Sequence, residues 1–156
     1  MAPDSDHTSS VLMVATRSHL RVEELVGAML EQIALGTPTP IHLEVLLPVV
    51  LPPTLPISAV PLRIATRLGV LRDSARDVLA TSGVPGAVAV VRCRSLRALL
   101  CAVEPVDRLV LVGGAGWSVR RAAKIAASDV VVVSTRSGRR GRAATSPRPA
   151  IEQRAR

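Results

Sequence analysis

The sequence predicts an α/β domain built on a five-stranded parallel sheet with helices on both faces. Two observations predict it. Short, continuously apolar segments rich in Val and Leu recur along the chain, and segments with helical spacing of apolar residues alternate with them. Strands without polar alternation are typical of sheets buried on both faces. Strand–helix alternation favours parallel order with right-handed crossovers. The hydrophobic content of 48% supplies a core, although Trp117 is the only aromatic residue.

The first strand–helix unit is expected near the N-terminus. Val11–Thr16 is a short apolar strand. Ser18 is the expected N-cap of the following helix, whose first turn holds Glu23 and Glu24, where the helix dipole favours acidic side chains. Gly36 is expected to end that helix, as glycine often does.

The second unit contains a proline-rich connection. Ile41–Leu47 is the expected strand, and Pro48 is expected to stop it because proline has no amide donor. We expect Pro48–Pro61 to be irregular and to lie against the domain. A long helix follows from Ile64, with apolar residues at alternating steps of four and three, and Ser82 with the next glycine closes it.

Two more helices are expected in the last part of the domain. Ser95 is the expected N-cap of a short helix and Ser118 that of a final one. The remaining expected strands are Ala87–Val91, Leu109–Val112 and Val130–Val133.

Charge and composition divide the chain into three parts. Residues 1–10 are polar and are expected to be disordered, residues 11–135 form the α/β domain, and residues 136–156 are expected to be a disordered, arginine-rich tail. That tail holds seven arginines against one acidic residue, Glu152, so it carries +6 of the net charge of +8. The basic character therefore belongs to the tail, whereas the domain is close to neutral.

Several classes of function find no support in the sequence. Cys93 and Cys101 are the only cysteines, and without CxxC spacing they indicate neither a zinc site nor a disulfide framework. The three histidines are scattered, and no catalytic set or GxSxG motif is present. The N-terminus lacks the pattern of a signal peptide, and prolines interrupt the longest apolar stretch. We expect a cytoplasmic protein with no metal site, no membrane contact and, on balance, no enzymatic activity.

One motif has the context of a phosphate-binding turn. Gly113–Gly116 follows an expected strand and precedes Ser118 and a helix, where glycine amides and a helix N-terminus can hold phosphate. The motif is neither a Walker A loop nor GxGxxG, and a tight strand-to-helix turn is the alternative explanation. Ligands of parallel sheets bind beyond the carboxyl ends of the strands, where the winding reverses. The loops after Thr16, Leu47 and Val112 meet at that edge.

The order of these segments resembles that of the universal stress protein family, within the adenine nucleotide alpha hydrolase-like folds. The resemblance implies the five-stranded sheet, an adenine-nucleotide site and a homodimer paired through the last strand, Val130–Val133. The matching segments are VLMVAT (11–16), IHLEVLLP (41–48), SGVPG (82–86), AVAVVRCRSLRALLCAVE (87–104), DRLVLVGGAG (107–116) and DVVVVS (129–134).

The resemblance also implies where the nucleotide site departs from the family pattern. ATP-binding members use an acidic residue directly after the first strand for the ribose, and a glycine loop with a spacer for phosphate. Here Arg17 occupies the acidic position, and Gly116 runs directly into Trp117 without the spacer. The candidate cofactor is ATP or another adenine nucleotide, and we expect its binding to be weak or lost. The nucleotide-binding candidates that remain are Thr16, Gly113, Gly116, Ser118 and Val119.

Three hypotheses for function follow. The first is a non-catalytic, universal-stress-like protein of stress response or signalling. The second is a small nucleotide- or phosphate-binding enzyme that uses the crevice at residues 113–118. The third is an accessory protein of nucleic acid or the ribosome, acting through weak, non-specific and salt-dependent contacts of the tail.

Overall fold

The computed structural model describes residues 7–17, 19–36, 39–56 and 60–134. It contains one five-stranded sheet in the order β3-β2-β1-β4-β5, and every neighbouring pair is parallel. The predicted fold class is therefore confirmed. The strands are β1 (Ser9–Ala15), β2 (Ile41–Val50), β3 (Gly86–Cys93), β4 (Val106–Val112) and β5 (Ala127–Val133). The helices are α1 (Val22–Leu35), α2 (Leu62–Ser82), α3 (Leu96–Ala102) and α4 (Trp117–Ala126).

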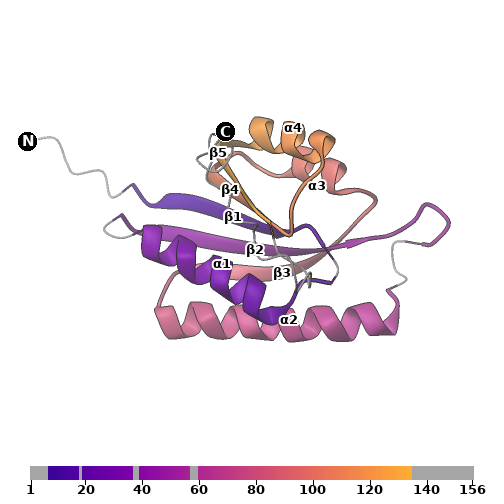
Figure 1. The fold of residues 1–156 in the computed structure, drawn as a ribbon, viewed down its shortest axis with the longest axis horizontal. Helices are drawn as coiled ribbons and strands as arrows, with labels where there is room; N and C mark the ends of the chain where they lie inside the picture. Colours follow the sequence, from indigo (N-terminus) through magenta and orange to yellow (C-terminus); the bar gives the residue numbers. More distant parts are fainter. Residues whose placement is uncertain (1–6, 18, 37–38, 57–59, 135–156) are drawn as a thin grey trace, which may run out of the picture.

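Helices cover both faces of the sheet (Figure 1), with α1 and α2 on one face and α3 and α4 on the other. Alternate residues of β1 enter two separate cores. Met13 packs into the core shared with α1 and α2, whereas Leu12 and Val14 pack into the core shared with α3 and α4. All three are at most 1% exposed, which explains why the strand is continuously apolar.

Pro48 does not stop the second strand, contrary to the sequence prediction. The amides of Leu43 and Leu51 both donate toward β3. The backbone N–H and C=O groups of odd-numbered residues in β2 therefore point to β3, and the backbone nitrogen of Pro48 points to β1. The last residue of β2 that pairs with β1 is Leu46. Because Pro48 lies beyond that pairing, its missing amide removes no hydrogen bond of the sheet, and β2 continues to Val50.

Two predicted helix starts were placed wrongly, and one was correct. The first helix begins at Val22, with Arg21 at the N-cap, and the Glu24 carboxylate accepts a 3.0 Å hydrogen bond from the Arg21 amide. Ser18 itself lies outside the described residues. Ser118 lies inside α4, whose N-cap is Gly116. Ser95 does cap α3, because its side-chain oxygen accepts from the Ala98 amide at 3.0 Å.

The N-terminal boundary of the domain differs from the prediction. Ser9 and Ser10, expected to be disordered, belong to β1 and pair with Ile41 and His42. Residues 1–6 and the whole tail at 136–156 lie outside the described residues, so the tail stays a prediction. Of the helices that the structure describes, none combines the length and the apolar character needed to cross a membrane.

Candidate functional site

The winding of the sheet reverses between β1 and β4. These strands are neighbours, yet β1 leads into α1 on one face and β4 leads into α4 on the other (Figure 1). The loops that leave them diverge and form the crevice where such sheets bind ligands. The structure brings Thr16 and Gly113 together at this point, as the sequence predicted for the edge of the sheet.

The glycine turn is bonded to the last strand. Gly113 and Gly114 have φ angles of 115° and 87°, which glycine adopts without strain. The amides of both donate to the Val133 carbonyl oxygen, at 2.9 and 3.2 Å. These two donors are therefore already used within the protein.

Thr16 connects the two loops of the crevice. Its amide donates to the Val112 carbonyl oxygen at 2.8 Å. Its hydroxyl lies 3.0 Å from the same oxygen and 2.5 Å from the Gly114 carbonyl oxygen. A Cβ on Gly113 would lie 2.8 Å from this hydroxyl oxygen, so the close approach requires glycine. The Thr16 side chain thus holds the turn, and its hydroxyl is occupied.

Arg17 lies against the glycine turn. A Cβ on Gly113 would come within 3.1 Å of the Arg17 Cγ, and one on Gly114 within 3.8 Å of its Nη2. The guanidinium therefore reaches across the turn and brings positive charge to the crevice. A guanidinium has only donors, so it cannot accept hydrogen bonds from ribose hydroxyls.

The other predicted site residues lie farther along α4. Gly116 caps the helix, and its carbonyl oxygen accepts from the Arg120 amide at 3.0 Å. Ser118 is exposed, whereas Val119 packs partly into the core under α3 and α4. Trp117 is 74% exposed, with the Arg121 guanidinium carbon 5.3 Å from its ring centroid, so the ring does not fill the crevice.

A cavity of about 350 Å³ opens beside Arg17, and sequence reasoning missed it. Thr16, Arg17 and His19 line one side. The remaining lining is aliphatic apart from the backbone, and none of the lining residues is acidic. The expected loop after the second strand was the only part of the sequence analysis that pointed to this place. The cavity also needs Ile64 from α2 and Leu96 from α3. The aliphatic side is formed by Ala15, Pro48, Val49, Val50, Ile64, Leu68 and Leu96.

Two guanidinium groups lie at this cavity, that of Arg17 in its lining and that of Arg67 through a contact with His19. The Nη1 of Arg67 lies 2.5 Å from Nδ1 of His19, so the guanidinium donates and the imidazole accepts. None of the ion pairs among the described residues involves Arg17 or Arg67. The cavity therefore has a cationic side without a neutralising carboxylate.

Comparisons with known proteins bear on the fold. No protein family model matches the sequence, and no curated protein matches it. A universal stress protein family protein from Arabidopsis thaliana, solved with AMP bound, is similar in structure, with a TM-score of 0.54 and 15% sequence identity. The match covers 83% of this chain and 93% of the Arabidopsis chain. A protein from the universal stress protein family from Burkholderia pseudomallei has a TM-score of 0.49 and 15% sequence identity. That match covers 85% of this chain and 100% of the Burkholderia chain. This chain has the universal stress protein fold. The resemblance predicted from the sequence is confirmed at that level.

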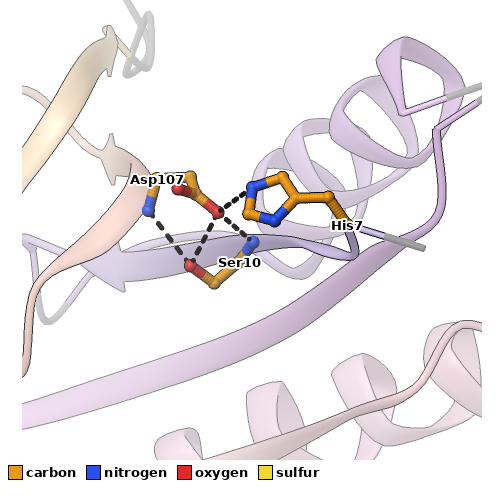
Figure 2. Close-up of polar contacts among 3 residues, drawn as sticks. All are labelled: His7, Ser10 and Asp107. Carbon is orange, nitrogen blue, oxygen red and sulfur yellow. Dashed lines mark hydrogen bonds and ion pairs between the residues drawn. The ribbon is translucent and has the colours of Figure 1, made fainter. Parts of the chain in front are cut away.

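A second polar cluster of this universal stress protein fold lies at the opposite, amino-terminal edge of the sheet. Figure 2 shows that Ser10 and His7 both approach the same oxygen of Asp107. The Ser10 amide and hydroxyl donate to Asp107 Oδ2 at 2.8 and 3.1 Å, and the Asp107 amide donates to the Ser10 oxygen at 3.0 Å. His7 Nε2 lies 3.9 Å from the same carboxylate oxygen.

This cluster is not a catalytic triad. In a triad the imidazole lies between the acid and the hydroxyl and takes the hydroxyl proton. Here the Ser10 hydroxyl donates directly to Asp107, and His7 approaches the same carboxylate oxygen and not the hydroxyl. Hydrogen bonds from the Ser10 amide, then from its hydroxyl, lower the pKa of the Asp107 carboxyl. The cluster joins β1 to β4.

Within the described ranges, no group of three or more His, Cys, Asp or Glu side chains is placed to hold a metal ion.

Proposed function

We propose that this chain is a divergent, non-catalytic universal stress protein that acts in the cytoplasm and binds adenine nucleotides weakly or not at all. The observation that carries the proposal is the use of the Gly113 and Gly114 amides by the Val133 carbonyl oxygen. Arg17 adds to it, because an acidic ribose ligand is absent at the end of β1. The fold neighbour with AMP bound makes the adenine nucleotide the ligand to test first.

The experiment is isothermal titration calorimetry of the full chain with AMP and with ATP. We expect dissociation constants on the order of 1 mM or weaker, which corresponds to about 4 kcal/mol of binding free energy or less. A sub-micromolar constant for either nucleotide would contradict the proposal.

The lining of the crevice supports the non-catalytic part of the proposal. A hydrolytic or transfer enzyme needs an acid or base beside the reacting group. No acidic residue lines the described cavity, and His19, its one imidazole, is held by Arg67. An ATP turnover assay tests the enzyme alternative: turnover that Ser118→Ala removes would favour it.

We further propose a homodimer paired through β5. The sheet order places β5 at an open edge, and Val130–Val133 are only half-buried. An apolar strand edge without cover is a template for pairing with another strand.

The contribution of the tail also remains a proposal. Its arginines would hold RNA through release of counterions, with steep salt dependence. Deleting residues 136–156 should abolish retention on RNA at low salt, and unchanged retention would exclude the tail as the cause.

A further inference from the structure

The cavity beside Arg17 has the dimensions of a small-molecule site. Its volume of about 350 Å³ is at the lower end of the range of about 300–1,000 Å³ that ligand sites show. Residues from the end of β2, the first turns of α2 and the start of α3 surround it. Val49 and Leu68 are 3% and 4% exposed, so the floor of the cavity belongs to the core and is pre-formed.

The chemistry of the lining favours an alkyl group over a planar base. The apolar residues are all aliphatic, and Trp117, the one residue among the Phe, Tyr and Trp types in the sequence, lies on α4 outside the lining. Aliphatic walls take up alkyl groups through burial of apolar surface. The one ring in the lining is the His19 imidazole, and its Nδ1 is already held by Arg67.

The open side of the cavity favours an anion. Arg17 and His19 both line it, and Arg67 contacts His19. Positive charge beside low-dielectric walls and without carboxylates attracts anions. A guanidinium binds carboxylate and phosphate oxygens through paired donors.

We propose that this cavity binds an amphiphilic anion, with an alkyl chain against Ile64, Leu68 and Leu96 and a carboxylate or phosphate head on Arg17. The inference rests on the proposed function in one respect: a nucleotide does not occupy the crevice. It assigns the same edge of the sheet a different class of ligand, one that needs no glycine cradle.

Binding to the full chain is measured by calorimetry with four probes: octanoate, octyl phosphate, octan-1-ol and AMP. Octanoate or octyl phosphate binds at least about tenfold more tightly than octan-1-ol, which has the chain without the charge, and the tighter of the two identifies the head group. Both anions binding no better than the alcohol would overturn the inference. The AMP titration tests the loss of nucleotide binding separately. If both AMP and octanoate bind tightly, only the proposed function is contradicted.

Three variants test the assigned residues. Arg17→Gln weakens the anion about tenfold and leaves the alcohol unchanged, whereas Leu96→Trp fills the cavity and weakens both. Arg97→Gln is the matched control, because Arg97 is exposed on α3, next to Leu96, and does not line the cavity. Equal effects of Arg17→Gln and Arg97→Gln would overturn the role of Arg17. Methyl shifts in NMR that occur away from Ile64 and Leu96 would overturn the site itself.

Discussion

The hydroxyl of Thr16 lies within hydrogen-bonding distance of the Gly114 carbonyl oxygen, although 98 positions separate the two residues. This contact joins the loop after β1 to the glycine turn after β4. The Val133 carbonyl oxygen of β5 accepts from the amides of the same turn. A turn with the sequence pattern of a phosphate cradle is thereby used to join three strands.

Thr16→Val tests this contact. Valine keeps the shape of threonine but leaves the Gly114 carbonyl oxygen without its hydroxyl donor. We expect a loss of about 1 kcal/mol in the free energy of unfolding, measured by urea denaturation. An unchanged denaturation midpoint would show that the hydroxyl does not hold the turn.

Gly113→Ala should destabilise the protein more strongly. The φ angle of 115° strains an alanine, and its Cβ would lie 2.8 Å from the Thr16 hydroxyl oxygen. We expect a loss of roughly 1–3 kcal/mol, from the backbone strain alone. Gly69→Ala is the control: it lies within α2 with nothing near the added Cβ, and should stabilise by roughly 0.5–1 kcal/mol. Equal effects of the two substitutions would contradict this account of the turn.

Asp107 should make stability depend on acid pH. Hydrogen bonds from Ser10 lower its pKa in the folded state below the ordinary value of 3.8. The stability that its carboxylate contributes is therefore present above that value and is lost as the pH falls through the lower, folded-state pKa. We expect the difference in free energy of unfolding between the wild type and Asp107→Asn to shrink below about pH 4. A difference that stays constant from pH 6 to pH 3 would contradict this role of Ser10.

Val132→Pro tests dimer pairing through β5. The Val133 carbonyl oxygen faces β4, so Val132, one position away, directs its amide to the open edge. Proline at this position removes an outward donor and leaves the pairing with β4. We expect the wild type to be a dimer and the variant a folded monomer by light scattering at tens of micromolar. A monomeric wild type would contradict the dimer.

Local patterns predicted the elements of the fold well. Continuous apolar strands, the Ser95 cap and the closing glycine after Ser82, at φ 70°, all depend on neighbours in sequence. Pro48 was misplaced because its effect depends on where β1 stops pairing, which is a property of another strand.

The site was less predictable for the same reason. Glycines after a strand indicate a turn with free amides, but the partner of those amides, Val133, is in the last strand. The cavity beside Arg17 needs Ile64 and Leu96, whose approach only the folded chain determines. Spacing along the sequence contains neither relationship.

The proposed loss of nucleotide binding rests on the Gly113 and Gly114 amides being bonded within the protein. Hydrogen exchange of these two amides by NMR, with and without AMP, tests it most directly. We predict slow exchange in the free protein and unchanged resonances at millimolar AMP. Fast exchange in the free protein, or protection and shifts that appear only with AMP, would contradict the claim.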